Sequence, residues 1–220
     1  EQRFEGAHTQ SEQDTSTSYL VRDNEKCILC RRCVAVCKSI QQVGVIAPVR
    51  RGFNTHIACA FDEDLADAPC VACGQCVAVC PTGALHEREE IDNVREAISD
   101  PDKVVIVAAA PAVRAAIGEE FGYPIGTNTE GKMFTAMRML GFDKVFDVNF
   151  GADLTIMEEA NELLHRVKEG GTLPMFTSCS PGWIRFVEYY YPELIPNLST
   201  CKSPMQMFGA TVKTYWAPKE

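Results

Sequence analysis

The sequence predicts a small α+β module dense in cysteine, followed by part of an α/β lobe with a parallel sheet. Two observations support this division. Nine of the 11 cysteines lie between residues 27 and 80, whereas the last 140 residues contain only Cys179 and Cys201. After residue 103, apolar runs typical of buried strands alternate with segments of helical periodicity. Strands separated by helices pair in parallel through right-handed crossovers, so the second part is expected to be an α/β lobe.

The composition indicates a globular protein and argues against two classes of partner. Hydrophobic residues make up 46% of the chain and charged residues 23%, as in folded domains. The 30 Asp and Glu residues outnumber the 21 Lys and Arg residues, which gives a net charge of −9, so nucleic acid is not an expected partner. The longest apolar runs, residues 104–110 and 182–191, are too short to span a bilayer. No signal segment opens the sequence, so we expect a cytoplasmic protein without a membrane span.

Changes in composition along the chain predict three segments. Residues 1–24 are polar and lack apolar periodicity, so they are expected to form a linker or extended arm. Residues 25–90 hold the cysteine block and are expected to form one small domain. Residues 91–220 are expected to form the lobe, which opens with a short connecting helix at 91–100.

Within the lobe, each expected element follows from a local pattern. VVIVAAA at residues 104–110 is a continuous apolar run, typical of a strand buried on both faces. The clearest helix is expected at 152–171, where Ile156, Leu163 and Val167 recur at helical spacing. The other expected elements are strands at 144–150 and 172–178, and helices at 111–121, 132–140, 181–191 and 204–216. Three strands are fewer than the roughly five or six usual in a sheet, so another chain segment or a partner is expected to complete it.

The cysteine block contains the pattern C-x2-C-x2-C-x3-C twice. The two copies are Cys27, Cys30, Cys33 and Cys37, then Cys70, Cys73, Cys76 and Cys80, the last followed by Pro81. This is the pattern of bacterial ferredoxins that hold two 4Fe–4S clusters. Three cysteines at steps of three wrap three corners of one cube. The fourth begins the next helix and points away, so it binds the other cluster.

The spacing therefore assigns two crossed sets of ligands. The first set is Cys27, Cys30, Cys33 and Cys80, and the second is Cys70, Cys73, Cys76 and Cys37. Structural zinc is an alternative, but it commonly uses paired C-x2-C elements without the third cysteine and the repeated x3-C. Disulfides are another, but they require an oxidising compartment. Cys59 lies outside both copies, so it is either a buried thiol or a ninth ligand.

Long segments on both sides of the block carry a family resemblance. CVACGQCVAVCPTGAL, VVIVAAAPAVRAAIGEEFG and FTSCSPGWIRFVEYYYPELIPNLSTCKSPMQMFGATVKTYW resemble the iron-only (di-iron) hydrogenases. Within that family, the sequence resembles the multi-cluster, NAD(P)-linked and electron-bifurcating large subunits. The resemblance covers nearly the whole chain, and it implies that the eight cysteines bind two accessory clusters.

The same resemblance points to a defect in the catalytic site. The family's motif reads T-S-C-C-P-x-W, in which the first Cys relays protons and the second binds the catalytic cluster. Here Cys179 matches the relay, and Ser180 stands where the ligand is expected. A serine hydroxyl is a weaker iron ligand than a thiolate. The family's later ligand motifs do not occur in this sequence. We therefore expect both positions to be vestigial and the chain not to be catalytic by itself.

The predicted function is electron transfer through two 4Fe–4S clusters, within a multi-subunit, electron-bifurcating hydrogenase linked to NADH and ferredoxin. The alternative is a fragment of a catalytically active iron-only hydrogenase. The resemblance implies three partners: a flavin-bearing NADH-oxidising subunit, a separate catalytic hydrogenase subunit, with a nickel–iron enzyme as one candidate, and ferredoxin. No G-x-G-x-x-G follows a strand, so neither flavin nor NAD is expected on this chain. The arm resembles a linker after further cluster domains, which leaves room for more iron–sulfur clusters upstream.

Overall fold

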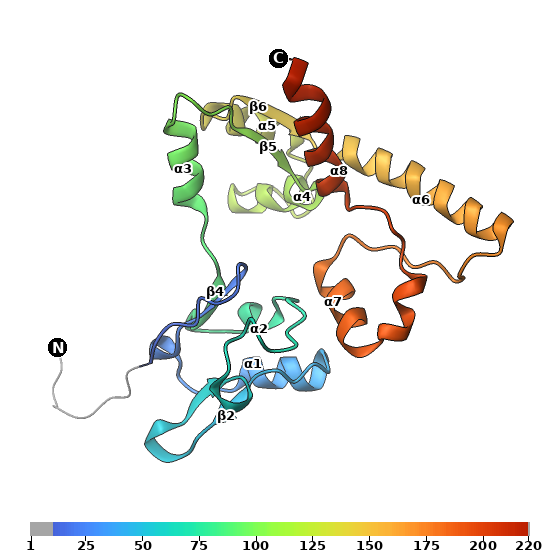
Figure 1. Cartoon of the computed structure of the whole chain (residues 1–220). Helices are drawn as coiled ribbons and strands as arrows, with labels where there is room; N and C mark the ends of the chain where they lie inside the picture. The colour runs from blue at the N-terminus through green and yellow to red at the C-terminus, as the bar shows by residue number, and fades with distance from the viewer. Residues whose placement is uncertain (1–10, 220) are drawn as a thin grey trace. The chain divides into compact units, whose positions relative to one another are not determined.

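The structure is a computed structural model that describes residues 11–219, and it divides into two compact units (Figure 1). The first unit lies within Glu1–Glu89 and also takes in Ser180–Ile195. The second comprises Glu90–Cys179 and Pro196–Glu220. The segment 180–195 therefore packs with the cysteine-rich part of the chain, although its sequence follows the lobe. Within the described residues, none of the helices combines the length and apolar character needed to cross a membrane.

The first unit is built from very short elements. Its strands are β1 (Leu20–Arg22), β2 (Ala47–Val49), β3 (His56–Ala58) and β4 (Leu85–Glu87), and its helices are η1 (Asn24–Lys26), α1 (Arg32–Ala35), η2 (Val36–Ile40), η3 (Gly52–Asn54), η4 (Ala60–Asp62), α2 (Gln75–Ala78) and α7 (Pro181–Tyr190). β1 pairs antiparallel with β4, and β2 pairs antiparallel with β3. The helices α1 and α2 each begin inside a cysteine motif. The result is a small ferredoxin-like region, as the sequence predicts.

β1 lies inside the segment that the sequence assigns to a linker. It is three residues long, which is too short for alternation to be detected. Its Arg22 pairs with Asp14, with 3.0 Å between Nη2 and Oδ2, and both side chains are buried. The backbones of these two residues also exchange hydrogen bonds, Asp14 N to Arg22 O at 2.9 Å and Arg22 N to Asp14 O at 3.0 Å. These bonds hold the described end of the arm against the first unit.

The second unit is an α/β region with a parallel sheet. Its elements are α3 (Ile91–Ser99), β5 (Ile106–Ala109), α4 (Pro111–Glu120), α5 (Glu130–Met139), β6 (Lys144–Asp147), α6 (Asn149–Glu169), α8 (Pro204–Thr211), η6 (Val212–Trp216) and η7 (Ala217–Lys219), and η5 (Pro192–Asn197) lies at the boundary of the two units. β5 and β6 pair in parallel, from Ile106 opposite Lys144 to Ala109 opposite Asp147.

The strand expected at 172–178 is wrong. Only Phe176 makes a single parallel bridge, to Leu198. Pro174 has no N–H to give to a ladder, which disfavours a strand there. The sheet of the described second unit therefore has two strands, not three.

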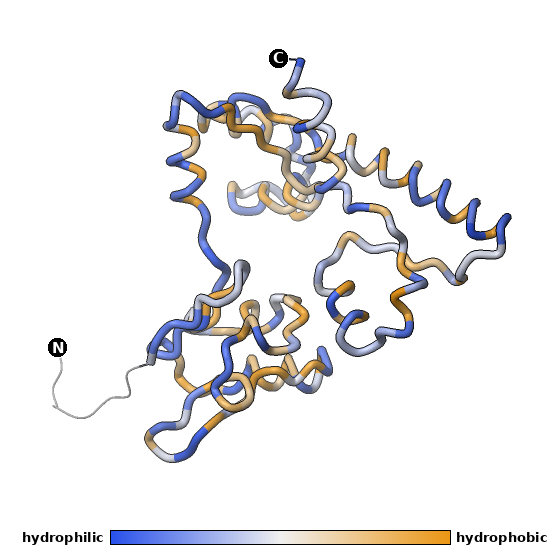
Figure 2. The backbone as a smooth tube through the Cα atoms, in the orientation of Figure 1, coloured by the Kyte–Doolittle hydropathy of each residue, from blue (hydrophilic) through white to orange (hydrophobic). Residues whose placement is uncertain are grey.

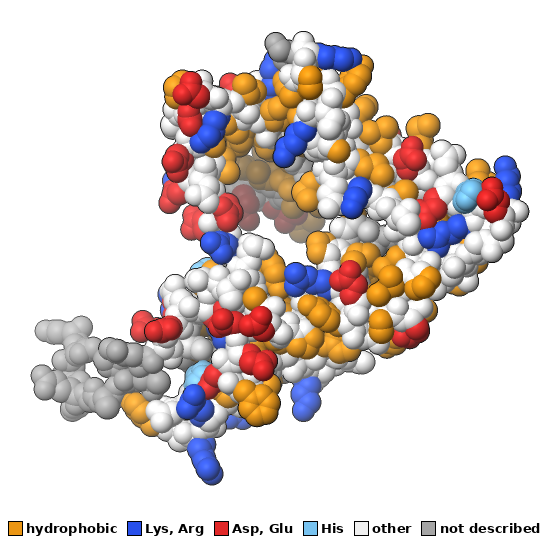
Figure 3. Space-filling view, viewed as in Figure 1, with side chains coloured by type: hydrophobic (Ala, Val, Ile, Leu, Met, Phe, Trp, Pro, Cys, Tyr) orange, Lys and Arg blue, Asp and Glu red, His pale blue; other side chains and the backbone are white. Residues whose placement is uncertain are grey.

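The apolar stripe of α6 is largely exposed. Ile156 is 65% exposed, Leu164 53% and Val167 59%. Figure 2 shows hydrophobic and hydrophilic residues alternating along this helix, and Figure 3 shows hydrophobic side chains at the surface of this unit. An amphipathic helix normally buries its apolar face. Among residues 11–219, no layer of the second unit covers this stripe.

α6 and α8 approach each other closely where Gly151 lies. A Cβ at this position would lie 2.3 Å from the carbonyl oxygen of Pro204 and 3.0 Å from the Cβ of Phe208. We expect Gly151→Ala to lower the free energy of unfolding of the second unit by about 1–3 kcal/mol, because the helices must move apart. Urea unfolding followed by circular dichroism measures the change. Gly131→Ala in α5 is the control, since its Cβ would meet no atom within 4 Å. An equal loss in both variants would contradict the steric explanation.

An ion-pair network joins α4, α5 and β6. Arg114 donates from Nη2 to Asp147 at 2.9 Å and from Nη1 to Glu130 at 2.7 Å. Burial raises the pKa of Asp147, but the Asn149 N–H and the Arg114 guanidinium outweigh it, so the pKa is lowered overall. A lowered pKa in the folded state stabilises the fold above the unfolded value of about 4 and loses that effect as the pH falls through the folded value.

Arg114→Gln is therefore expected to flatten the acid limb of the stability profile. From neutral pH to about pH 3, the variant should lose less unfolding free energy than the unmodified protein, because less of its stability depends on an ionised Asp147. Urea unfolding at each pH measures the two profiles. Arg95→Gln, which breaks an exposed pair with Asp92, is the control and should leave the profile unchanged. Parallel profiles for Arg114→Gln and the unmodified protein would contradict the prediction.

Candidate iron–sulfur site

The two cysteine motifs share a left-handed backbone on both sides of their second cysteine. The residue before the second cysteine has a left-handed backbone in both copies: φ is 55° at Leu29 and 57° at Ala72. The residue after it is also left-handed, with φ of 61° at Arg31 and 72° at Gly74, and it caps α1 or α2. Such turns direct successive backbone N–H groups into a concave loop. In the first copy, the N–H of Leu29 donates to Cys27 Sγ at 3.4 Å.

The structure gathers the eight cysteines into two groups of four. One cavity, of about 150 Å³, is lined by Cys37, Cys70, Cys73 and Cys76. Another is lined by Cys27, Cys30, Cys33 and Cys80. The fourth cysteine of each motif thus lies with the other motif. Apolar side chains fill out both linings, among them Leu85.

The electrostatics of the thiols reflect the same grouping. Burial raises the pKa of Cys33 to about 11, with further increases from Cys27, Cys30 and Cys80, while the Val34 N–H opposes them.

In the other group, the pKa of Cys76 is raised to about 12. Burial is the main cause, and the neighbouring Cys70, Cys73 and Cys37 add to it. Buried thiols such as Cys33 and Cys76 resist ionisation, so a cationic metal is needed to turn them into thiolates, since a coordinating thiol is deprotonated outright.

Cys80 differs from these two. Burial raises its pKa, but the N–H groups of Leu85, Thr82 and Ala84 and the Thr82 hydroxyl outweigh it, so the pKa is lowered overall. Hydrogen bonds to a ligand sulfur stabilise its negative charge and are one of the terms that set a cluster's potential.

The sulfurs of each group are compatible with the four corners of a 4Fe–4S cube. Among residues 11–219, no three His, Cys, Asp or Glu side chains lie close enough to share one metal ion. In a four-iron cube each cysteine binds a different iron, so its four sulfurs stand farther apart than the ligands of one ion. The donor set, four thiols in a mainly apolar lining, fits a 4Fe–4S cluster at each group.

The remaining cysteines occupy other surroundings. Cys59 is 1% exposed in the core of the first unit, where Arg22 Nη1 lies 3.9 Å from its Sγ and burial raises its pKa. Cys179 is exposed. Ser180 is the N-cap of α7, and its hydroxyl accepts the Trp183 N–H at 3.5 Å. The serine at this position therefore has a local structural role at the start of a helix.

Sequence reasoning missed a hydrogen-bonded carboxylate in the second unit. Glu162 accepts from Arg166 Nη2 at 2.6 Å, from Ser199 Oγ at 2.7 Å and from the Thr200 N–H at 3.1 Å, and Cys201 Sγ lies 3.6 Å from it. Burial raises the pKa of Glu162, but the Ser199 and Arg166 hydrogen bonds outweigh it, so the pKa is lowered overall. The i,i+4 spacing of Glu162 and Arg166 could have predicted their ion pair from the sequence. Nothing in the sequence predicts the hydrogen bond from Ser199, because it lies 37 residues away.

Known proteins match both units. Residues 103–220 match the family described as "Iron only hydrogenase large subunit, C-terminal domain", and residues 26–84 match the 4Fe-4S dicluster domain. The NADP-reducing hydrogenase subunit HndD of Solidesulfovibrio fructosivorans is 52% identical over 99% of this chain and 38% of its own length. Iron hydrogenase 1 of Clostridium pasteurianum is 51% identical over 92% of this chain and 35% of its own length.

A solved structure agrees. The apo [FeFe]-hydrogenase HydA1 variant from Chlamydomonas reinhardtii superposes with a TM-score of 0.57 and 48% identity, over 60% of this chain and 34% of that chain. The chain thus spans little more than a third of the length of each of these proteins. The family match covers more than half of the 220 residues. The chain therefore belongs to the iron-only hydrogenase large-subunit family, and residues 26–84 of its first unit match a 4Fe-4S dicluster domain.

Proposed function

We propose that this chain relays electrons through two 4Fe–4S clusters as a subunit of a multi-subunit, electron-bifurcating hydrogenase linked to NADH and ferredoxin. The first cluster is held by Cys27, Cys30, Cys33 and Cys80, and the second by Cys70, Cys73, Cys76 and Cys37. The observation that carries the proposal is the gathering of eight cysteines into two groups of four with exchanged fourth members. When bound, each cluster supplies one-electron redox chemistry.

The chain's own residues provide the remaining requirements of a relay. Leu85 and Val71 are buried beside the cysteines and limit the access of water. Each group also has one exposed cysteine, Cys30 in the first and Cys73 in the second. One edge of each site therefore reaches the surface of the unit, where an electron partner can approach.

The proposed partners are a flavin-bearing NADH-oxidising subunit, a separate catalytic hydrogenase subunit and ferredoxin, in the cytoplasm. The support is the relative HndD, whose name describes it as a subunit of an NADP-reducing hydrogenase. The flavin and the nicotinamide belong to partners in this proposal, since the chain lacks a Gly-rich phosphate-binding loop.

The second candidate is a part of a catalytically active iron-only hydrogenase. Its support is the 51% identity to Iron hydrogenase 1, of which the chain spans 35%. Against it stands Ser180, which replaces a thiolate ligand in the family's motif.

Iron analysis and infrared spectroscopy of the full-length protein separate the two candidates. Under the relay proposal, residues 11–219 bind about eight irons as iron–sulfur clusters, and the infrared spectrum shows no carbonyl or cyanide bands. Such bands would identify a di-iron centre and establish the second candidate. A full-length protein with fewer than about eight irons after anaerobic reconstitution would overturn both cluster assignments.

A further inference from the structure

Helix α7 returns to the first unit and lies on the loop of the second cysteine motif. A Cβ at Gly182, in its first turn, would lie 3.3 Å from the carbonyl oxygen of Val71 and 3.6 Å from the Cα of Cys73. At the other end of the helix, the Tyr190 hydroxyl donates to the carbonyl oxygen of Val43 at 3.3 Å. The helix is therefore anchored at both ends against this part of the unit.

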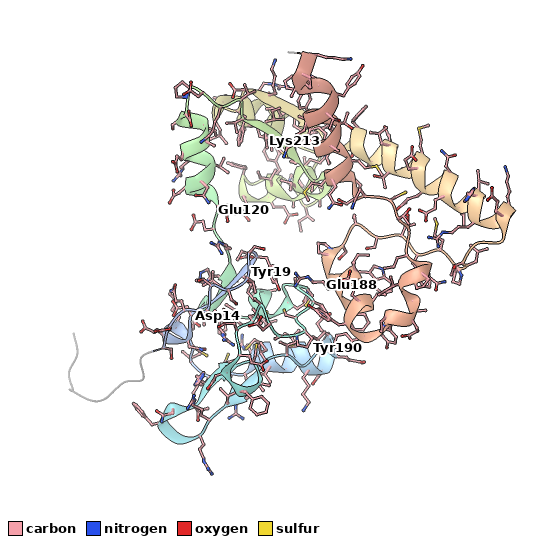
Figure 4. All side chains as sticks on the ribbon, viewed as in Figure 1. Asp14, Tyr19, Glu120, Glu188, Tyr190 and Lys213 are labelled. Carbon is pink, nitrogen blue, oxygen red and sulfur yellow. The ribbon has the colours of Figure 1, made fainter. Side chains whose placement is uncertain are left out.

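Between these anchors, Arg185 points its guanidinium at the backbone of a cluster ligand. Nη1 donates to the carbonyl oxygen of Cys70 at 3.3 Å and to the Tyr19 hydroxyl at 3.0 Å. The guanidinium carbon lies 5.2 Å from the centroid of the Tyr19 ring. Figure 4 labels Tyr19 and Tyr190 in the same unit. Stacking and two hydrogen bonds fix the charge in one place.

The charge of Arg185 is not neutralised by a carboxylate. Among residues 11–219, the hydrogen bonds of Arg185 go to the neutral oxygens of Tyr19 and Cys70, and its ring contact is with Tyr19. Arg22 lines the same cavity, but it pairs with Asp14 at 3.0 Å. A guanidinium stays protonated at any working pH, so Arg185 presents a full positive charge beside the second motif.

We infer that Arg185 is a positioning residue that raises the reduction potential of the cluster held by Cys37, Cys70, Cys73 and Cys76. The inference rests on the proposed function, because it needs that cluster to be bound. Reduction adds one negative charge to the cluster, and a fixed positive charge nearby stabilises the reduced form more than the oxidised form. The effect biases electrons toward the second cluster and away from the first.

A redox titration of the cluster-loaded full chain, followed by electron paramagnetic resonance, tests the inference. Arg185→Gln is expected to lower the equilibrium constant for reduction of the second cluster by about tenfold, which is about 59 mV for a one-electron couple. The first cluster should keep its potential. Cys30→Ser and Cys73→Ser variants assign the two signals.

Two further variants separate charge from packing. Arg185→Lys keeps the positive charge, so the reduction potential of the second cluster should stay close to that of the unmodified protein. Val187→Ala loosens the packing of α7 at a buried apolar residue without changing a charge, and it should leave both potentials unchanged. If Arg185→Gln does not bind eight irons, Arg185→Met takes its place, because it keeps a long side chain and removes the charge. An unchanged second couple in Arg185→Met would overturn the inference.

The outcomes distinguish the inference from the function on which it rests. Unmodified protein without two redox couples would contradict the relay itself. Two couples in the unmodified protein, with an unchanged second couple in Arg185→Gln, would refute the tuning role alone. A shift in Val187→Ala as large as that in Arg185→Gln would also refute it, because packing would then explain the change.

Discussion

Removal of iron is expected to unfold the first unit while the second unit stays folded. The strands of the first unit have three residues each, α1 and α2 have four each, and α7 has ten, so its regular structure is too short to be stable by itself. Its core includes Cys33, one of the proposed cluster ligands, which is 8% exposed. Metal binding supplies folding free energy in such domains, of the order of 10 kcal/mol for a structural metal site.

The measurement is amide hydrogen exchange before and after chelation of the iron under anaerobic conditions. Protection in β1 and β4 should be lost, because the metal no longer compensates for the repulsion and burial of the thiols. The helix α6 serves as the internal control, and its protection should not change. Retained protection in β1 and β4 after loss of all iron would show that the unit folds without metal.

Loss of the Cys80 thiol is expected to remove the cluster bound by the first motif, although Cys80 belongs to the second. In the structure Cys80 lies with Cys27, Cys30 and Cys33. We expect Cys80→Ser to lose about four of about eight irons, because serine is a weak ligand for iron. Iron analysis gives the loss, and paramagnetic resonance identifies the cluster that is lost.

Two matched variants complete this experiment. Cys37→Ser is expected to affect the opposite cluster, since Cys37 lies with the second motif. Cys59→Ser replaces a buried thiol outside both groups and should retain all the iron. If Cys80→Ser disturbed only the cluster of its own motif, the crossed assignment would be wrong.

Long, strongly patterned elements were predictable from the sequence. The helix expected at 111–121 is observed as α4, Pro111–Glu120, and the one expected at 152–171 as α6, Asn149–Glu169. The parallel pair β5 and β6 lies within the two runs expected to be strands. Each strand lies in a mainly apolar run, and each helix follows a 3.6-residue hydrophobic repeat. Each of these patterns persists for several residues and is followed by Pro or Gly.

The remaining elements depend on contacts between residues far apart in the sequence, which local sequence patterns do not predict. β1 and β4 are each three residues long and are paired by the fold around the cysteines. The contact between Arg185 and Tyr19 joins residues 166 positions apart. The apolar run at 172–178 satisfies the strand pattern but contains Pro174 and finds no neighbouring strand.

The candidate site also has one part that the sequence predicts and one part that depends on distant contacts. The grouping of Cys37 with the second motif and Cys80 with the first follows from spacing, because the crossed ligation is a property of the repeated pattern. The position of Arg185 does not follow from spacing, since the helix that carries it lies about 100 residues beyond the last cluster cysteine. Arginines on amphipathic helices are usually solvated, so nothing local marks this one.

Because α7 packs in the first unit, the dicluster module is made from two separate stretches of the chain. A transplant of residues 11–89 alone into another protein would expose the Val71 carbonyl, the backbone of Cys73 and the Cys70 carbonyl that Arg185 now satisfies. A transferable form of this dicluster module therefore needs α7 as well, joined by a new linker that replaces the second unit.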